Sequence, residues 1–570
     1  MALTITACTS QPSTTQAPGS SPETSSETIA ENDVLKLLYW QAPTILNPHL
    51  ATGFKDFDAA RLVYEPLASY NKDDQFIPFL AAEIPSLENG GVAEDGKSVT
   101  WKLKQNVQWS DGEPFTAEDV VFTYNFVMNP EVAAASREYY SLIETVEALD
   151  SHTVKITFKD VTPSWSIPFT GQNGLILPQH IFEAYNGANI REAPANQQPI
   201  GTGPYLVTEF RPGDVVLYTA NPAYWDEGKP YFQNVELKGG GDATSAARAV
   251  LQTGDVDYAH NLQVESNILQ QLEAGGQGKV LATFGSSVER ILFNFTDPNK
   301  ETADGERSST QFPHPFFTDL KVRQAFDLAI DRDTIANQLY GVTGRPIAQL
   351  LVAPQIYQSD QIDYEFNLEK AQQLLDEAGW KDTNGNGVRD KDNVEMKVLF
   401  QTSVNPVRQK TQEIIKQSLE SIGVEVELKS IDASVFFSGD PANPETLNHF
   451  YADLQEFTTG NDSPDPSAYM KWRTCDEIAQ KSNDWQRNNY ARYCNPEYDK
   501  LWQQANQETD PEKRAQLYKA MDELLRREMV LLPLVHRADA NGVSNRLSGV
   551  DPTPWDANTW DVKNWQRSGS

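Results

Sequence analysis

The sequence predicts a large mixed α/β protein with more than one lobe, and three observations support this prediction. First, 570 residues exceed what one hydrophobic core organises, since single cores seldom grow beyond about 250–300 residues. Second, short apolar runs alternate with amphipathic stretches, with Gly and Pro between them. Third, 39% hydrophobic residues suffice for a core, while no run of about 18 apolar residues is present to cross a membrane.

The N-terminus predicts a lipid anchor and a flexible tether. Ile5-Thr6-Ala7-Cys8 resembles the end of a bacterial lipoprotein signal, so we expect residues 1–8 to be a remnant signal with Cys8 lipidated. Residues 9–32 are rich in Ser, Thr and Pro and lack aromatic and basic residues, which predicts a disordered tether with a reach of about 27 Å. The alternative is a disordered tail with a chance cysteine.

Strand and helix signals are clear beyond residue 33. Val34–Trp40 and Val99–Leu103 are predicted strands, and Thr116 with Asp119 forms a capping-box-like start for a helix through Met128. Later elements begin at similar caps and end at similar breakers. They are helices Val322–Ile330 after Asp319, Leu368–Ala378 after Asn367, Pro406–Ile422 before Gly423 and Pro511–Glu528 after Asp510, and strands Val424–Leu428 and Val530–Val535.

One motif matches a nucleotide-binding pattern only formally. Gly91–Ser98 fits the P-loop spacing, but a phosphate cradle needs a following helix and an electropositive loop. Here Glu94 and Asp95 lie inside the loop and a predicted strand follows. We therefore expect a turn between strands.

A second motif resembles half of a calcium-binding loop. Asp382–Asp390 has the Asp/Asn/Asn/Gly spacing of the first half. The twelfth position is Asn393 where a bidentate Glu would be needed, and Arg389 adds a positive charge. A weak calcium site between Asp382 and Asn393 and a solvated Asx-rich turn both remain open.

Catalytic patterns are sparse. The seven histidines are never closer than 28 residues apart, which removes local zinc motifs, and no Gly-x-Ser-x-Gly sequence occurs. With 80 Asp and Glu residues, some carboxylates must lie near one another, so a secreted glycoside hydrolase stays as a remote alternative. The sequence predicts no cofactor.

The net charge of −33 bears on the partners. An acidic surface repels phosphate backbones and anionic headgroups, which argues against nucleic acid as a partner and against direct adhesion to a membrane. We expect the lipid on Cys8 to make the only membrane contact.

Two further cysteines, Cys475 and Cys494, enclose 18 residues in a polar stretch. If Cys8 is lipidated, these two form a natural pair, and a crosslink over a loop of this size stabilises by about 3 kcal/mol in the chain-entropy model. Such bonds belong outside the cytoplasm. The alternative is two unpaired thiols; metal ligation is disfavoured because no His lies within 25 residues of either cysteine.

Seven blocks together resemble the bacterial extracellular solute-binding proteins of family 5, which serve ABC importers of oligopeptides, dipeptides or nickel. They occur in register between about residues 34 and 540, which makes the resemblance specific. The blocks are Pro43–His49, Val63–Leu67, Trp109–Phe122, Gly201–Tyr205, Asn221–Trp225, Val322–Arg332 and Ala371–Trp380.

The resemblance implies a type II periplasmic-binding-protein-like fold, with two lobes, a hinge and an extra subdomain on the first lobe. We expect hinge crossovers near Arg290–Phe295 and Val530–Val535. The expected ranges are 33–70, 195–289 and 531–570 for the first lobe, 71–194 for the subdomain and 290–530 for the second lobe. Members of this family are not enzymes. The resemblance also implies a monomer that meets a permease and its ATPase at the periplasmic or outer face of the membrane.

The resemblance also suggests ligand-binding residues. Peptide-binding relatives carry an Asp that pairs with the ligand's α-ammonium, and the matching residue here is Asp462. A carboxylate in a closed cleft makes a strong charge-assisted hydrogen bond with an ammonium. The other candidates flank this residue or lie on facing segments: Asn461, Gly460, Thr459, Phe457, Thr44, Ser403 and Asn405.

The resemblance also bears on the length and the chemical class of the ligand. Dipeptide-type relatives place an Arg just before the helix that begins here at Pro406, whereas this chain has Gln401–Asn405, so we expect a longer peptide held mainly through backbone pairing. An oligosaccharide is the alternative within this fold. Nickel is disfavoured because no histidine cluster offers ligands.

Overall fold

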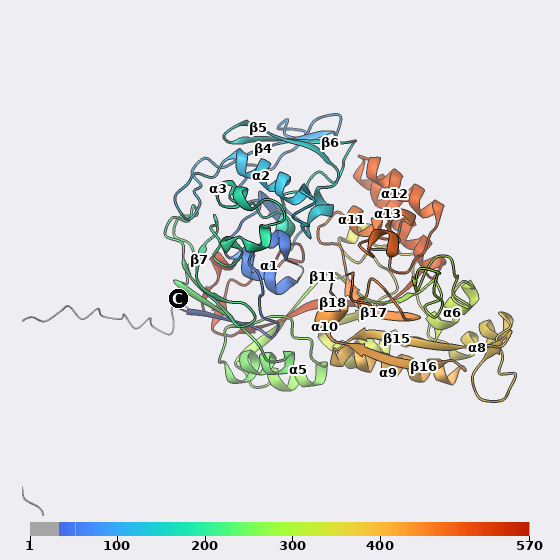
Figure 1. The fold of residues 1–570 in the computed structure, drawn as a ribbon. Coiled ribbons are helices and arrows are strands. Elements are labelled where there is room, and N and C mark those ends of the chain that lie inside the picture. The colour runs from blue at the N-terminus through green and yellow to red at the C-terminus, as the bar shows by residue number, and fades with distance from the viewer. Residues whose placement is uncertain (1–33, 52, 439–440, 569–570) are drawn as a thin grey trace, which may run out of the picture.

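A computed structural model describes residues 34–51, 53–438 and 441–568, and its largest element is an 11-stranded mixed sheet (Figure 1). The strand path runs from the outer edge of one half of the molecule to the outer edge of the other. In order, it contains β16 (Glu425–Ile431), β15 (Lys397–Ser403), β17 (Leu454–Thr459), β11 (Gly278–Phe293), β18 (Leu531–Ser544), β10 (Tyr258–Ala259), β1 (Val34–Tyr39), β9 (Asn234–Gly239), β8 (Val215–Ala220) and β7 (Tyr205–Arg211), with β12 (Gly344–Pro346) paired to β18.

Strands β11 and β18 connect the two halves. Toward the first lobe β18 pairs with β10, and toward the second lobe β11 pairs with β17 from Val288 to Phe293. The pairing between β11 and β18 themselves is interrupted between Phe284 and Val288. This break lies in the two strands expected to form the hinge, but a few residues before Arg290–Phe295.

The strand predicted over Val530–Val535 is longer in the structure. β18 continues to Ser544, although its sequence contains Pro533 and several polar residues. Pro533 lies opposite Arg290 at a second register shift, where a strand tolerates a residue without an N–H donor. The strand therefore passes a residue that normally signals its end.

The subdomain is built on a three-stranded antiparallel sheet of β4 (Ser98–Lys102), β6 (Thr153–Phe158) and β5 (Ile143–Asp150). Helix α2 (Ala117–Met128) begins as predicted, because the Asp119 carboxylate accepts a hydrogen bond from the Thr116 amide at 2.9 Å. The same carboxylate accepts from the amide of Gln179, at the start of α3 (Gln179–Phe182), at 3.0 Å. Since β4 begins at Ser98, the P-loop-like segment leads into a strand, as expected.

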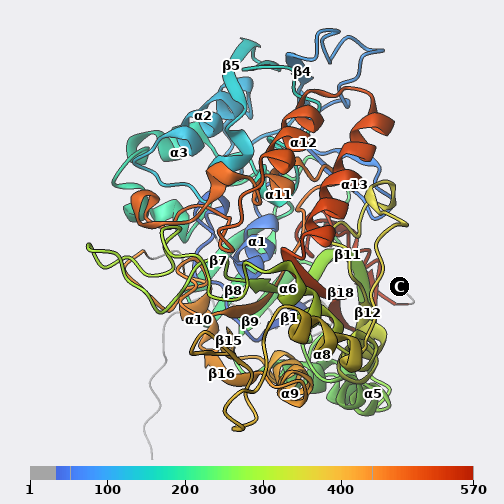
Figure 2. The same ribbon diagram turned by 90° about the vertical axis from the view of Figure 1, so that its right-hand side faces the viewer.

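The second lobe carries helices on both faces of its sheet (Figures 1 and 2). Because neighbouring residues of a strand point to opposite faces, Ile291 and Phe293 of β11 join one apolar core and Leu292 joins the other. The first core is covered by α6 (Leu320–Leu328), α8 (Leu368–Glu377) and α9 (Pro406–Ser421), and the second by α11 (Ser467–Lys471), α12 (Pro496–Gln507) and α13 (Pro511–Arg527). Asn367 and Asp510 cap α8 and α13, as predicted, and Asn405 caps α9, which begins at Pro406 as predicted.

The C-terminal segment completes the first lobe. Asp556 lies 3.3 Å from the Arg61 guanidinium of α1 (Phe54–Arg61), and both side chains are buried. Trp565 belongs to the same apolar core as Leu35 and Leu37 of β1. The two ends of the described chain thus share one core.

The remaining elements are short. Two-stranded sheets are β2 (Ala68–Tyr70) with β3 (Phe76–Pro78), β13 (Asp390–Lys391) with β14 (Val394–Glu395), and β19 (Leu547–Ser548) with β20 (Gln566–Arg567). Other helices are α4 (Ala243–Arg248), α5 (Ser266–Glu273), α7 (Arg332–Thr334) and α10 (Ala433–Phe436). Single turns of 3-10 or π geometry are η2 (Pro48–Leu50), η3 (Arg137–Tyr140), η4 (Gly171–Asn173), η5 (Glu183–Tyr185), η6 (Ile190–Glu192), η7 (Pro194–Asn196), η8 (Ala249–Thr253), η9 (Ile335–Tyr340), η10 (Gly341–Thr343), η11 (Gln355–Tyr357), η12 (Cys475–Glu477), η13 (Lys481–Asn483) and η14 (Val562–Asn564).

Candidate functional site

The predicted segment Gly460–Asp462 leaves the end of β17 and is fixed against the break in β11. The Ser286 hydroxyl donates a hydrogen bond to the Asn461 carbonyl at 2.6 Å. Gly460 packs directly on Ser286, where a Cβ would overlap the Ser286 hydroxyl and carbonyl oxygens. A glycine is therefore required here by close backbone approach. The Asn461 side chain turns inward and donates to the Ser463 carbonyl at 2.8 Å, while its own oxygen is buried without a partner.

Asp462 faces the subdomain. Its carboxylate accepts a hydrogen bond from the Tyr139 hydroxyl, which comes from η3 of the subdomain. Although the Asp462 side chain stays exposed to solvent, the surrounding protein disfavours its charged form and raises its pKa, and the Tyr139 hydrogen bond opposes this rise. The second lobe and the subdomain thus meet at an acid whose described hydrogen-bond partner is a neutral hydroxyl.

A second contact joins the same two parts of the molecule. The Lys471 ammonium, at the end of α11, lies 2.7 Å from the Glu138 carboxylate and 3.3 Å from that of Glu477. Burial alone would lower the pKa of Lys471, but the two carboxylates outweigh this effect and raise it. The ion pair and the Tyr139–Asp462 hydrogen bond together hold the subdomain against α11.

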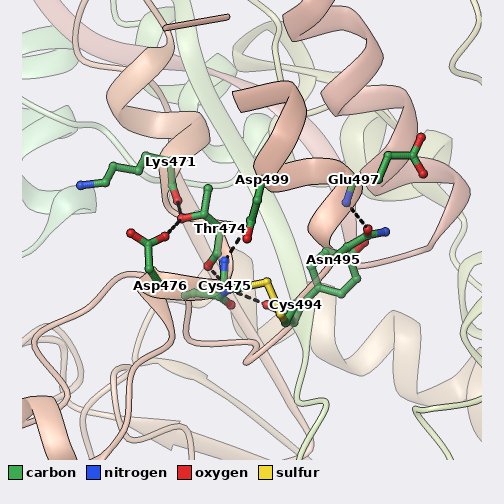
Figure 3. Close-up of a disulfide and its surroundings, with 10 residues drawn as sticks. Lys471, Thr474, Cys475, Asp476, Cys494, Asn495, Glu497 and Asp499 are labelled. Carbon is green, nitrogen blue, oxygen red and sulfur yellow. Dashed lines mark hydrogen bonds between the residues drawn. A yellow bond between two sulfur atoms is a disulfide. The ribbon is translucent and has the colours of Figure 1, made fainter. Parts of the chain in front are cut away.

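The disulfide begins close to this contact in the sequence, since Cys475 follows Lys471 by four residues. Cys475 and Cys494 are bonded, as predicted, so the alternative of two unpaired thiols is wrong. The Cys475 amide donates to the Asp499 carboxylate of α12 at 3.1 Å, which ties the turn after α11 to α12 (Figure 3). Lys471 extends away from the disulfide in this view. Cys8, the predicted lipid site, lies outside the described residues.

Ser403 and Asn405 form a second group, at the N-terminus of α9. Ser403 accepts a hydrogen bond from Arg408 at 2.8 Å, and Asn405 accepts from the amide of Arg408 at 3.2 Å as the helix cap. The Asn405 side-chain amide also contacts that of Gln263 in the first lobe. Arg408 itself lies 2.8 Å from Glu289, and its guanidinium outweighs burial to hold the pKa of Glu289 below its usual range.

Thr458 links the two groups. Its hydroxyl lies between the guanidinium groups of Arg408, at 3.2 Å, and Arg537, at 3.3 Å. Arg537 in turn donates to Asn261 of the first lobe at 2.9 Å. Residues 403 and 405 thus lie beside β17, whose end leads into Gly460–Asp462, and Gln263 and Asn261 of the first lobe contact this region.

Three predicted residues have other surroundings. Phe457 is buried in the second-lobe core beneath the Arg290 guanidinium, 4.7 Å from its ring centre. Thr459 pairs with Val288 in the sheet, and its hydroxyl donates to the Tyr469 hydroxyl at 3.2 Å. Thr44 is exposed in the first lobe, with its amide 2.7 Å from the Asp56 carboxylate. Their contact with a ligand stays a prediction.

Sequence reasoning missed the residues that come from the facing parts. Tyr139 meets Asp462 across a separation of 323 residues, and Glu138 meets Lys471 across 333. No local pattern signals such pairs. Arg408 could have been found from the sequence. Dipeptide-type relatives place an Arg just before this helix, and Arg408 lies two residues after its first residue, Pro406.

In the calcium-like loop, the Asp382 carboxylate is hydrogen-bonded to backbone amides of the loop itself. The Asp382 carboxylate accepts hydrogen bonds from the amides of Gly385 at 2.7 Å and Gly387 at 2.9 Å, and Asn386 donates to Glu395 at 2.7 Å. This is the geometry of an Asx-rich turn. Within the described residues no group of three His, Cys, Asp or Glu side chains is placed to hold a metal ion. The same part of the chain contains no helix that is both long and apolar enough to cross a membrane.

Comparison with known proteins places these features in a family. Residues 75–480 match the model of bacterial extracellular solute-binding proteins, family 5. The chain belongs to this family. As a family 5 solute-binding protein, it is 27% identical over 533 residues to the oligopeptide-binding protein AppA of Bacillus subtilis strain 168, covering 92% of this chain and 89% of AppA. It is 28% identical over 400 residues to the nickel-binding periplasmic protein of Escherichia coli K12, covering 69% and 70% of the two chains.

Solved structures agree on the fold. AppA from Bacillus subtilis, in complex with a nonapeptide, has a TM-score of 0.76 at 24% identity and covers 94% of this family 5 chain and 99% of its own. The dipeptide-binding protein of Pseudoalteromonas sp. SM9913, in complex with Met-Leu, has a TM-score of 0.76 at 22% identity, covering 94% and 100%. The two-lobed type II fold expected from the sequence is thus confirmed.

Proposed function

We propose that the protein is the substrate-binding subunit of an ABC importer that captures peptides, oligopeptides rather than dipeptides, between its lobes. Its ligand would be held where β17, η3 and the start of α9 face one another. In this proposal the loaded protein docks on a permease driven by an ATPase, works as a monomer, and is tethered to the outer face of the membrane by a lipid on Cys8.

The Asp462 carboxylate carries this proposal. It faces the subdomain, and its described hydrogen-bond partner is the neutral Tyr139 hydroxyl. A ligand ammonium placed there would supply the missing positive charge and make a charge-assisted hydrogen bond, worth about 1.5–3 kcal/mol. A neutral sugar would leave the acid uncompensated, so the geometry favours a free peptide N-terminus.

The segment before α9 supports the preference for longer peptides. Gln401, Thr402 and Ser403 are buried, and their side chains bond to Gln455, to the Glu456 carbonyl and to Arg408. The nearby cation of Arg408 is already neutralised by Glu289. Residues 401–405 contain no Arg or Lys to hold the carboxylate of a short ligand, so in this proposal backbone pairing along an extended peptide supplies the affinity.

A thermal-shift screen of mixed peptides and mixed oligosaccharides tests the proposal. A ligand at 100 times its Kd stabilises the folded protein by about 2.7 kcal/mol. We expect peptides to raise the Tm and oligosaccharides to leave it unchanged. A response to oligosaccharides alone would replace the peptide assignment, and release of sugar products would replace the binding function itself.

A substitution of Asp462 tests whether this carboxylate binds the ligand ammonium. Asp462→Asn is expected to weaken a peptide with a free N-terminus by about 10- to 100-fold and an N-acetylated analogue far less. Asp73→Asn, in the exposed turn between β2 and β3, is the matched control. Equal losses for the free and acetylated peptides would make Asp462 a structural residue.

A further inference from the structure

A cavity of about 50 Å³ lies between the subdomain and helices α11 and α12. Leu142, Phe158 and Ile167 line it from the subdomain, and Ala468 and Trp502 line it from the second lobe. Leu142 is 40% exposed, an unusual position for an apolar side chain that faces a neighbouring part of the same molecule. The walls of the cavity thus come from two parts of the chain that are far apart in the sequence.

The polar groups of this cavity leave no free charge. Glu138 and Lys471 also line it, but they pair with each other at 2.7 Å. Asn506 offers a side-chain oxygen that is buried without a hydrogen-bond partner. The cavity therefore suits an apolar group that carries an N–H nearby, and disfavours a charged group, which would be desolvated there without a counter-ion.

Tyr139 connects the cavity to the proposed ammonium site. Its side chain lines the cavity, and its hydroxyl donates to Asp462. A peptide whose N-terminus meets Asp462 therefore places the side chain of its first residue beside this opening. Resting on the peptide-binding function proposed above, we infer that the cavity is the specificity pocket for an aliphatic first residue of the ligand.

Size selects among apolar side chains. One water needs about 10–15 Å³ of such space, so about 50 Å³ corresponds to roughly three to five water-sized positions. That is the scale of the four carbons of a leucine side chain, and it is too small for an indole. The Asn506 oxygen is then available to a main-chain N–H of the ligand.

Isothermal titration of the full-length protein with pentapeptides that differ only in the first residue tests this inference. The peptides are alanine pentamers in which that residue is Ala, Leu, Asp or Lys. We expect the Leu-first peptide to bind at least about tenfold more tightly than the Ala-first peptide, because it buries an additional aliphatic side chain, and the Asp-first and Lys-first peptides to bind no better than the Ala-first peptide.

Two variants assign the preference to this cavity. Leu142→Asp introduces a charge at an exposed position of the wall, and Ala468→Leu fills the space; both are expected to reduce the Leu-over-Ala preference to about twofold or less while the Ala-first peptide still binds. Leu149→Asp, at a position on β5 that is 57% exposed, is the matched control and should keep the preference.

The outcomes distinguish a wrong pocket assignment from a wrong peptide-binding function. If wild type binds Leu-first and Ala-first peptides equally, or if Leu149→Asp reduces the preference as much as Leu142→Asp, the pocket assignment is wrong and peptide binding stands. If none of the peptides tested in the screen or in this series binds, the proposed function is wrong and the pocket assignment falls with it.

Discussion

The Lys471 ammonium lies 2.7 Å from the Glu138 carboxylate, so the second lobe and the subdomain are joined by an ion pair beside the Tyr139–Asp462 hydrogen bond. Proteins of two lobes close when contacts of this kind, and contacts to the ligand, favour the closed arrangement. The pair is only partly buried, with side-chain exposures of 20% for Lys471 and 39% for Glu138. Its contribution to closure is therefore modest and measurable.

Breaking this ion pair is expected to weaken ligand binding slightly. A partly exposed pair contributes about 0.2–1 kcal/mol, so Lys471→Met or Glu138→Gln should raise the Kd of the tightest peptide by about fivefold at most. The double variant should lose little more than either single one, since both remove the same interaction. Titration calorimetry of all four proteins checks this; fully additive losses would mean that the two side chains act independently.

Adding a methyl group at Gly460 is expected to displace the ligand-facing segment. In Gly460→Ala the new Cβ overlaps backbone and hydroxyl oxygens of Ser286, which must shift at a cost of about 1–3 kcal/mol. Both the Tm and the peptide affinity should fall. Gly53→Ala is the control, because its Cβ would come no closer than 3.6 Å to a neighbour. Equal behaviour of the two variants would contradict the close packing of Gly460 on Ser286.

Removing the disulfide is expected to destabilise the second lobe. Replacing both Cys475 and Cys494 by Ser releases a loop whose closure is worth about 3 kcal/mol in the chain-entropy model. Urea unfolding should show a loss of about 2–4 kcal/mol, and reduced wild type should behave like the variant. An unchanged midpoint after reduction would show that the bond contributes nothing to the folded state.

Asp58 is expected to make stability depend on pH. Burial raises its pKa to about 7, against the hydrogen bonds from Tyr39 and Asn558. Because this pKa is above that of a free Asp, about 3.9, the folded protein binds the proton more tightly; the group stabilises the fold below about pH 4, and this stabilisation is lost as the pH rises through about 7. Acidic conditions therefore favour the folded state at this residue.

Asp58→Asn should remove this dependence. The free energy of unfolding of the variant is expected to decrease less than that of wild type between pH 4.5 and 7.5, as followed by urea unfolding at several pH values. The exposed Asp73→Asn should retain the wild-type slope. If wild type and Asp58→Asn have the same slope, Asp58 does not titrate in this range.

The elements that could be predicted from sequence are those with local signals. The Thr116–Asp119 start of α2, the Asn405-Pro406 start of α9 and the Asp510-Pro511 start of α13 each depend on hydrogen bonds within a few residues. The long strand β18 was predicted only as far as Val535, because its continuation is stabilised by pairing with β11 rather than by its own pattern. Strand propensity gives no information about such partners.

The candidate site also combines residues with local sequence signals and residues that meet only through long-range contacts. Asp462 and Asn405 are candidates because they lie in short segments that resemble those of the family, whereas Tyr139, Glu138 and Lys471 meet only because the subdomain folds over α11. Phe457, also a predicted ligand contact, is directed by the alternation along β17 into the core beneath Arg290, and its contact with a ligand stays a prediction. A motif therefore locates a segment, and the pleat of the strand decides which of its side chains face the opposite lobe.

The buried pair of Arg61 and Asp556, 495 residues apart, also constrains the order of events when the chain is made. The first lobe needs α1 from the beginning of the chain together with β18 and the segment that ends in Trp565. Because domains fold as their residues become available, this lobe stays incomplete until nearly the whole polypeptide has been synthesised. A chain that ends before Leu531 would lack one of the two connecting strands and leave the apolar face of β1 uncovered, whereas a full-length chain closes its first and last segments together.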